Sequence, residues 1–295
     1  MSFRTVMIER PCKLSYSGGF MQVRFEDGVK KILLAEINSV LLATTQIYVS
    51  ARLASELAKA KISLVVCDEK FLPIGQYLPL YGAHNCAKRI QEQLAWGDVP
   101  KKQVWQTIVK HKIIQQARLL HDRGKTSEKM LFAFSKDVKS GDSTNREAAA
   151  ARIYFASLFG ENFSRDIENS INASLNYGYS ILMSMVAREI SLKGYLTQVG
   201  IFHRNEYNQF NLACDLMEPF RPFVDRVVFD NDSGNFSRDM RKLLTSIPTM
   251  TVQYKDGEYK FSSVVAFYVQ DCFNALNKKI TAEDIIDFKV AEDGF

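Results

Sequence analysis

The chain has 295 residues, of which 46% are hydrophobic and 24% are charged, and its net charge is +5. This composition excludes a disordered, collagen-like or coiled-coil chain, and no apolar run approaches the roughly 18 to 20 residues of a membrane span. Arg4, Glu9 and Arg10 interrupt what would be the apolar core of a signal peptide, and the five cysteines form no CxxC pair. We therefore expect a cytoplasmic, reduced protein without a zinc knuckle or a disulfide framework.

Residues 1–76 have the pattern of a small β domain. One helix is expected after Ser50, whose hydroxyl can cap it and which is followed by an apolar stripe of Leu53 and Leu57. A cluster of prolines and glycines between residues 73 and 82 then indicates a domain boundary, with a linker at 77–83. Short apolar stretches separated by turn signals predict strands at Phe3–Ile8, Phe20–Phe25, Lys31–Ala35, Ile37–Leu42 and Ile62–Cys67.

From residue 84 the apolar period changes to that of helices. A long helix is expected from Pro100 to the breaker at Gly124, and Asp256-Gly257 predicts one small hairpin from 251–254 and 258–261. The expected fold is therefore α+β, with a small N-terminal β domain (1–76) and a larger all-helical C-terminal domain (84–295). Further helices are expected at Glu128–Lys139, Arg146–Leu158, Ile167–Leu192, Asn211–Val228, Phe236–Thr245 and Ser262–Leu276.

The charge is distributed unevenly along the chain. Residues 1–76 carry a net charge of +3, residues 77–150 carry +6 and residues 151–295 carry −4. The middle segment is a candidate surface for DNA phosphates, although ordinary solvated helix faces would give the same pattern. The basic residues that recur along the long predicted helix are Lys101, Lys102, Lys110, Lys112 and Arg118.

A small set of acids and one histidine are the candidates for chemistry. The motifs GxxxxGK[ST], GxGxxG and GxSxG are absent, which disfavours chemistry driven by ATP or a nicotinamide cofactor. Asp215 and Glu218 are three residues apart and would share one helix face, and His203 lies in a predicted loop that can turn back over that helix. Glu147 precedes four alanines, which would let neighbouring helices approach closely. Oxygen ligands with one imidazole suit Mg²⁺ or Mn²⁺.

Structural roles would explain the same residues. Glu147 would also complement a helix N-terminus, and Asp215 and Glu218 would also pair with Arg221 or Arg204. The polar, aromatic segment SINASLNYGY, which contains Asn172 and Tyr177, would line a crevice beside the Glu147 helix or form a capped surface helix. The residue pattern alone leaves these alternatives open.

Three segments together resemble one known family. They read NREAAAARIYFASLFG, NASLNYGYSILMSMVAREI and GIFHRNEYNQFNLACDLMEPFRPFVD, and they follow an N-terminal segment that contains YVSARLASELAKAKISLVVCD. These passages are similar to the CRISPR-associated integrase of spacer acquisition, the first of the Cas proteins, and most similar to its type II form. The resemblance covers most of the chain, and the three motifs occur in the family's order.

The resemblance implies a homodimer formed through the N-terminal β domain and a divalent metal held by the helical domain. The family's ligand positions correspond here to Glu147, His203 and Glu218, with Asp215 as a neighbouring acid; many relatives have aspartate in place of Glu218. The family assembles with DNA, namely a prespacer fragment and the CRISPR repeat, and with a small second adaptation protein in a heterohexamer. Type II relatives also involve further adaptation factors and the RNA-guided effector.

The implied reaction is a metal-dependent DNA strand transfer. A 3′-hydroxyl of a new spacer attacks a phosphodiester at a repeat border, assisted by Mg²⁺ or Mn²⁺. Arg204, next to His203, would neutralise charge on the phosphorane or form a salt bridge, and Tyr177 and Asn172 would contact DNA. Two other functions are kept as alternatives: a stand-alone metal-dependent DNA nuclease, and a non-catalytic DNA-binding scaffold that does not need the three ligand candidates to lie close together.

Overall fold

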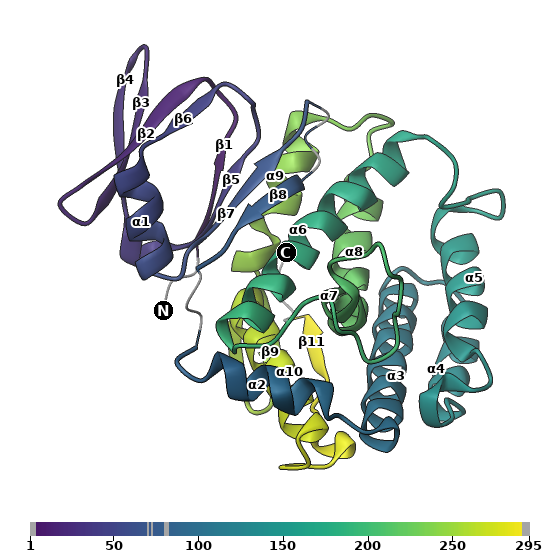
Figure 1. Cartoon of the computed structure of the whole chain (residues 1–295). Coiled ribbons are helices and arrows are strands. Elements are labelled where there is room, and N and C mark those ends of the chain that lie inside the picture. The colour runs from purple at the N-terminus through teal and green to yellow at the C-terminus, as the bar shows by residue number, and fades with distance from the viewer. Residues whose placement is uncertain (1–3, 70, 72, 80–82, 291–295) are drawn as a thin grey trace.

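The structure is a computed structural model, and it describes residues 4–69, 71, 73–79 and 83–290. Strands form the N-terminal part and helices dominate the remainder, as Figure 1 shows, so the predicted α+β class is confirmed. Two predicted features fall partly outside the described residues: Phe3 in the first strand and positions 80–82 in the linker.

Two sheets make up the N-terminal part. One has the strand order β4-β3-β2-β6, in which the β2–β3 and β3–β4 pairs are antiparallel hairpins. The other has the order β1-β5-β7-β8, in which β1, β5 and β7 are parallel and β8 is an antiparallel edge strand. The strands are β1 (Arg4–Ile8), β2 (Cys12–Ser17), β3 (Phe20–Phe25), β4 (Gly28–Leu33), β5 (Ile37–Leu42), β6 (Ile47–Val49), β7 (Ser63–Cys67) and β8 (Pro73–Tyr77).

The predicted helix of this part is confirmed as α1 (Ala51–Lys59). The Ser50 hydroxyl accepts a hydrogen bond from the Leu53 amide at 3.2 Å, which is an N-terminal cap. Leu53 and Leu57 are fully buried and join the apolar side chains of both sheets, including Leu14 and Ile37, in one core. Burial of this stripe is what holds the helix against the strands.

The C-terminal part is mostly helical, and its core is built around α6. It also contains a small sheet of order β10-β9-β11, in which the β9–β10 hairpin was predicted and strand β11 was not. The elements are α2 (Cys86–Leu94), α3 (Asp98–Asp122), α4 (Glu128–Lys136), α5 (Arg146–Phe159), α6 (Ser170–Leu192), α7 (Asn211–Met217), α8 (Arg221–Asn231), α9 (Arg238–Ser246), β9 (Thr251–Tyr254), β10 (Gly257–Lys260), α10 (Phe261–Leu276) and β11 (Phe288–Val290); short 3₁₀ turns are η1 (Leu34–Glu36), η2 (Ser140–Asp142), η3 (Glu218–Phe220), η4 (Ile247–Thr249) and η5 (Ala282–Asp284).

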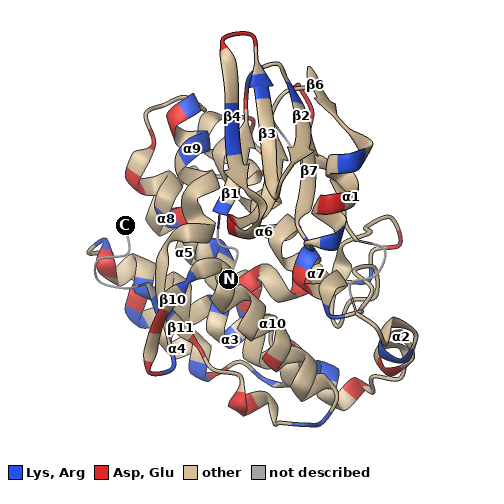
Figure 2. Cartoon of the chain, turned by 90° about the vertical axis from the view of Figure 1, so that its left-hand side faces the viewer, with Lys and Arg blue, Asp and Glu red and all other residues tan. Residues whose placement is uncertain are grey.

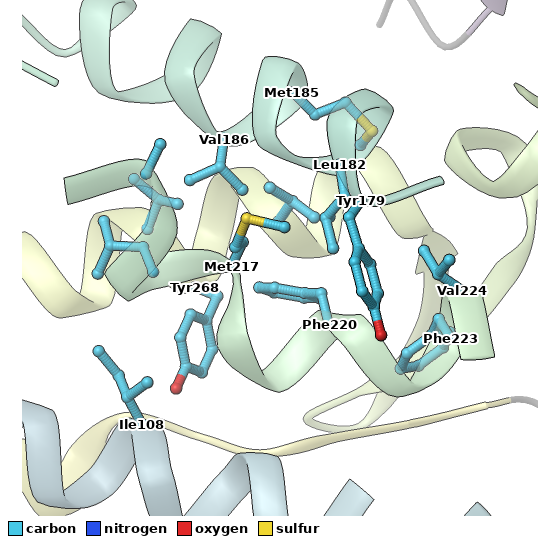
Figure 3. Packing of buried hydrophobic residues seen from close by; sticks show 14 of the residues in the cluster. Ile108, Tyr179, Leu182, Met185, Val186, Met217, Phe220, Phe223, Val224 and Tyr268 are labelled. Atoms are coloured by element: carbon cyan, nitrogen blue, oxygen red, sulfur yellow. The ribbon is translucent and has the colours of Figure 1, made fainter. Parts of the chain in front are cut away.

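One predicted helix, Asn211–Val228, is divided into α7, η3 and α8. Pro219 and Pro222 lie at the starts of η3 and α8, where their missing amide hydrogens are tolerated but do not continue a regular helix. The break brings Phe220 inwards, where it stacks on Phe288 of β11 with ring centroids 4.5 Å apart and meets Tyr268 of α10 edge-on. Figure 3 shows Phe220, Met217 and Tyr268 packed below Leu182 and Val186 of α6.

Helix α6 approaches α8 very closely at Gly178. A Cβ atom added there would lie only 2.4 Å from Cγ1 of Val224, so a side chain at this position would force the two helices apart. This contact fixes α6 against the segment that carries Asp215 and Glu218. The position of the candidate site therefore depends on a buried helix crossing.

The N-terminal sheet β1-β5-β7-β8 contacts the helical part through α6. Arg188 donates to the Lys61 carbonyl at 2.7 Å, and Gln76 of β8 donates to the Ser184 carbonyl at 3.0 Å. Leu41 and Val65 of this sheet belong to the helical core rather than to the N-terminal one. One face of this sheet is thus covered within the chain itself, and β8 continues one residue past the predicted boundary at residue 76. No helix in the described part of the chain is long and apolar enough to cross a membrane.

Candidate active site

Glu147 lies in the first turn of α5, where a buried aspartate caps the helix. The Asp142 carboxylate accepts hydrogen bonds from the amides of Arg146 at 2.9 Å and of Glu147 at 3.0 Å. Because Asp142 satisfies these first-turn donors, the Glu147 side chain is not needed as a cap. It is directed instead towards α3, and 21% of the side chain is exposed.

A lysine of α3 lies between two of the predicted ligand residues. The Lys112 ammonium is 2.6 Å from Oε1 of Glu147 and forms an ion pair with Oε2 of Glu218 at 2.5 Å. Only 11% of the Lys112 side chain is exposed. Burial alone would lower the pKa of Lys112, but Glu218 and Glu147 outweigh burial, and the pKa is raised. The ammonium is therefore the cation that compensates both carboxylates.

Glu218 is a buried acid whose carboxylate contacts two cations, Lys112 and Arg221. Its Oε1 accepts a hydrogen bond from Nε of Arg221 at 2.9 Å, and its side chain is 5% exposed. Burial acts to raise the pKa of Glu218, but Arg221 and Lys112 outweigh it and bring the pKa to about 2. The carboxylate is consequently ionised at every ordinary pH.

Asp215 of α7 has a different role from Glu218. Its carboxylate accepts hydrogen bonds from three successive amides, those of Ile201 (2.7 Å), Phe202 (3.1 Å) and His203 (3.0 Å), and contacts Nδ1 of His203 at 2.6 Å. Gly200 makes this wrapping possible, because an added Cβ would lie 2.8 Å from Oδ2 of Asp215 and 2.4 Å from the His203 carbonyl oxygen. Asp215 therefore holds the loop and the imidazole in place.

His203 is oriented by this contact. A carboxylate only accepts hydrogen bonds, so the Nδ1 of His203 carries the proton in the neutral ring and Nε2 keeps a lone pair. The hydrogen bond with Asp215 raises the pKa of His203 against the effect of burial, and Glu218 and Glu147 raise it further. The two carboxylates that contact Lys112 therefore also favour the protonated form of the His203 ring.

The predicted residues Glu147, His203 and Glu218 are brought into one region from α5, the 193–210 loop and η3. In the described part of the chain, however, no three His, Cys, Asp or Glu side chains are close enough together to hold a metal ion. The chemistry of the donor set, two carboxylates and an imidazole, still fits a hard divalent cation. In this structure the position between the carboxylates contains the Lys112 ammonium.

Comparisons with known proteins identify the family. Residues 6–233 match the model of the family "CRISPR associated protein Cas1". The chain belongs to the Cas1 family. It is 40% identical over 229 residues to the CRISPR-associated endonuclease Cas1 of Neisseria meningitidis serogroup C (strain 8013), an alignment that covers 77% of this chain and 75% of the relative.

Solved structures share the Cas1 fold at low sequence identity. A casposase bound to integration product superposes with a TM-score of 0.75 at 18% identity, covering 100% of this chain and 94% of that one. A chain of a Cas6-RT-Cas1–Cas2 complex superposes with a TM-score of 0.72 at 18% identity, covering 98% of this chain and 36% of that one. At these identities the superpositions establish the fold alone. The type II assignment stays a prediction.

The structure separates the residues that were predicted to contact DNA into buried and accessible ones. Tyr177 is fully buried, and its hydroxyl faces Thr245. Asn172 is also buried: its amide group donates to the carbonyls of Ser164 and Ile167, while Asn169 caps the start of α6. Since neither side chain reaches the surface, their assignment to DNA contacts does not fit the structure. Asn172 and Tyr177 are thus core residues, and they neither line a crevice nor lie on an exposed helix face. Only the start of this segment is capped, by Asn169.

The basic residues of α3 are divided in the same way. Lys112 is buried between two acids, and Arg118 pairs with Asp287 at 2.7 Å and donates to the Phe288 carbonyl, so neither forms part of an open basic face. Lys102 is exposed and Lys101 and Lys110 are partly exposed. Arg204 is exposed and forms no ion pair with any described residue. Figure 2 shows acidic and basic segments interspersed across the helical part.

From the sequence, Asp142 was missed, and Lys112 was assigned to DNA contacts rather than to the site. Lys112 follows Val104 and Ile108 at four-residue spacing, so the register that predicts a buried face of α3 also places Lys112 on it. Asp142 precedes the α5 residues Arg146 and Glu147 and is a preferred capping residue type. Both signals are present in the sequence, but only the fold shows what each side chain contacts.

Proposed function

We propose that this Cas1-family chain is a divalent-metal-dependent DNA strand transferase that inserts new spacers at CRISPR repeat borders. The observation that carries the proposal is the pair Glu147 and Glu218, which share one buried cation beside an imidazole that Asp215 holds in a fixed orientation. The 40% identical relative is named an endonuclease, and the chain of similar fold that is named a casposase is described as bound to integration product. Both names agree with chemistry on a DNA phosphodiester.

Glu147, Glu218 and Nε2 of His203 would hold the metal, and Mg²⁺ or Mn²⁺ fits these donors. When bound, the ion would lower the pKa of the attacking hydroxyl and polarise the phosphate. Asp215 is not a direct ligand in this proposal, because its oxygens already accept three amide hydrogen bonds and contact the imidazole. Its role is to orient His203, as outer-shell carboxylates do for other metal-binding histidines.

The proposed reaction exchanges one phosphodiester bond for another, and two arginines of the chain support it. The 3′-hydroxyl oxygen of the incoming DNA forms a bond to phosphorus, and the bond from phosphorus to the target's 3′-oxygen breaks. The attacking hydroxyl loses its proton to solvent, and the departing 3′-oxygen takes up a proton from solvent. One phosphodiester replaces another, so no nucleotide cofactor is required. Arg221 keeps Glu218 ionised and oriented, and the exposed Arg204 beside His203 would neutralise charge on the phosphorane.

The partners of this activity are proposals that rest on the family. They are a prespacer fragment and the repeat DNA, a second copy of the chain joined through the N-terminal sheets, and the small second adaptation protein in a heterohexamer. The solved chain of similar fold from a Cas6-RT-Cas1–Cas2 complex supports the last partner. Further type II factors and the RNA-guided effector depend on the type II assignment.

The test is joining of a labelled DNA fragment to a supercoiled plasmid that carries a repeat, with Mn²⁺ or Mg²⁺. Glu147→Ala should reduce joining by about 100-fold or more, since even residues that only support metal ligands cost about 10- to 100-fold. DNA affinity should be nearly unchanged, because the metal acts mainly on charge that develops during the reaction. The fold should also persist, because Lys112 keeps Glu218 as its partner.

Glu161→Ala is the matched control, because this glutamate is exposed and follows the same helix. It should join DNA at the wild-type rate. If Glu147→Ala also does so, the strand-transfer site is wrongly placed, and if the wild type neither joins nor nicks the plasmid, the scaffold function becomes the better one. If the wild type only nicks the plasmid and joins nothing, the chain is a nuclease.

A further inference from the structure

A hollow of about 300 Å³ lies beside the candidate active site, at the start of α3 and against the loop that carries His203. We propose that it binds one unpaired nucleotide of a DNA end by stacking its base on Phe202. The inference rests on the proposed function, since it concerns how a DNA end is held next to the same site. Its lining includes Asp98, Lys101, Lys102, Trp105, Phe202 and Arg204.

The aromatic wall of the hollow is formed by Phe202, which is supported from behind by Trp105 and is partly exposed. The rings of Trp105 and Phe202 stack with centroids 4.2 Å apart and planes inclined by only 6°. Trp105 is 1% exposed, whereas Phe202 is 47% exposed. A large apolar side chain that is supported from behind and left open in front provides the flat surface on which nucleobases stack, and such stacking does not depend on the base.

Positive charge surrounds this aromatic surface. Lys101, Lys102 and Arg204 line the hollow, and Arg204 has no ion-pair partner among the described residues. Asp98 is an acid in the lining, so the net charge of the hollow is positive. Cations beside an exposed aromatic ring match the alternating phosphates and bases of single-stranded DNA better than they match an apolar or cationic ligand.

The hollow shares lining residues with a second hollow that His203 lines. The second hollow, of about 390 Å³, is lined by Lys101, His203 and Arg204, so Lys101 and Arg204 border both spaces. The ring of Phe202 lies 5.7 Å from the His203 ring, centroid to centroid, and meets it edge-on. A base stacked on Phe202 would therefore lie next to the imidazole of the proposed site, and its phosphate would face the shared cations.

Position 202 is fixed by the same contacts that orient His203. The Phe202 amide donates to Oδ2 of Asp215 at 3.1 Å, so the backbone of the loop is anchored on both sides of the aromatic side chain. Replacement of the Phe202 side chain leaves this anchor in place. The stacking surface can accordingly be altered without removing the interactions that hold His203.

The experiment compares two DNA probes, a blunt duplex and the same duplex with a short 3′ single-stranded overhang, each binding the full chain in EDTA. Phe202→Ala should weaken overhang binding by about fivefold or more, the lower end of the loss seen for a base–aromatic stack, and should leave blunt-duplex binding unchanged. With 2-aminopurine at successive overhang positions, one position should be quenched by the wild type and not by Phe202→Ala.

Phe202→Trp and Tyr207→Ala are the controls. Phe202→Trp should retain both the quenching and the overhang affinity, while Tyr207→Ala removes an 87% exposed aromatic residue from the same loop and should change neither. Equal overhang binding and quenching by Phe202→Ala and the wild type would overturn the inference. The binding measurement needs neither metal nor joining, so it is independent of the test of the proposed function. Glu147→Ala should lose joining and keep the overhang preference, which separates a failure of this inference from a failure of the proposed function.

Discussion

Glu218 and Asp225 are buried carboxylates only seven residues apart on the segment from η3 to α8, yet their environments differ in kind. Arg221 and Lys112 contact Glu218 and bring its pKa to about 2 against the effect of burial. Asp225 accepts hydrogen bonds from the hydroxyls of Tyr154 and Tyr179, and burial raises its pKa to about 6. Burial alone therefore does not set the pKa of these acids. The pKa also depends on whether the groups that contact the carboxylate are cations or neutral hydroxyls.

The difference assigns the two acids different tasks. Glu218 is kept ionised by cations and faces the candidate active site, as a group that is to bind a metal must. Asp225 joins α5, α6 and α8 through neutral hydroxyl donors in the core. The two environments meet at Arg221, which pairs with Glu218 and lies 4.6 Å from the centre of the Tyr179 ring. Three predictions test this comparison, in order of decreasing effect.

The largest effect is expected from Glu218→Gln. The substitution leaves Arg221 without its carboxylate and Lys112 with Glu147 alone, and breaking one side of a buried ion pair costs about 3 to 5 kcal/mol of unfolding free energy. Strand transfer should also be lost. Asp225→Asn should change stability by only about 1 kcal/mol, because the amide oxygen still accepts from one tyrosine hydroxyl and the amide NH₂ can donate to the oxygen of the other.

Urea unfolding at pH 7, followed by circular dichroism, measures both variants. Asp225→Asn serves as the matched control, since it makes the same chemical change on the same segment. Similar losses of unfolding free energy in the two variants would contradict the distinction between cation-compensated and hydroxyl-compensated acids.

The second prediction concerns the cation itself. If a metal binds Glu147 and Glu218, it must displace the Lys112 ammonium that contacts both. Lys112→Met removes this competing charge with little change of shape, so Mn²⁺ should bind about tenfold more tightly in calorimetry, while the metal-free variant should melt at a lower temperature because the carboxylates then repel each other.

Lys110→Met is the control for that measurement, because Lys110 lies on the same helix but lines a separate hollow with residues of η5. It should bind Mn²⁺ like the wild type. Weaker Mn²⁺ binding by Lys112→Met than by the wild type would mean that the lysine supports the metal rather than competing with it.

The fold could be predicted where local patterns decide the structure. The α1 cap at Ser50 and the long helix α3 are read from neighbouring residues, and both are confirmed. Strand β8 was missed because Pro73 and Gly75 normally interrupt strands, but β8 lies at a sheet edge, where a proline is tolerated. Strand β2, CKLSYS, alternates apolar or aromatic residues with polar ones, so its signal was present in the sequence but was missed, whereas β6 has only three residues, too few to show an alternation.

The candidate site could be predicted only as a set of residues. The spacing of Asp215 and Glu218 indicates a shared helix face, but η3 begins at Glu218, and the two carboxylates take different partners. The wrapping of the 201–203 amides around Asp215 and the contact between Lys112 and Glu147 each join segments that are distant in sequence. Such contacts depend on tertiary packing, which no local pattern specifies.

The smallest effect is expected in the pH dependence of stability. Because the pKa of Asp225 is about 6 in the folded state and lies near 3.8 in the unfolded state, the folded protein binds more protons between these values, and its stability falls as the pH rises through them. Between pH 5 and 6.5 this loss amounts to about 1 kcal/mol of unfolding free energy. Glu218 adds no slope there, since its pKa is lowered and its stabilisation is complete above about pH 5.

The groups facing Asp225 do not alter this expectation. Tyr154 of α5 and Tyr179 of α6 have pKa values raised well above 10, mainly by burial, so they stay protonated in this range, and Arg221 and Arg165 stay charged. Asp225→Asn should abolish the 1 kcal/mol component, so the stability of the variant relative to the wild type should increase from pH 5 to 6.5 in urea titrations. Parallel pH profiles would show that Asp225 is ionised throughout the range, and that its hydroxyl partners stabilise its charge as effectively as the cations stabilise Glu218.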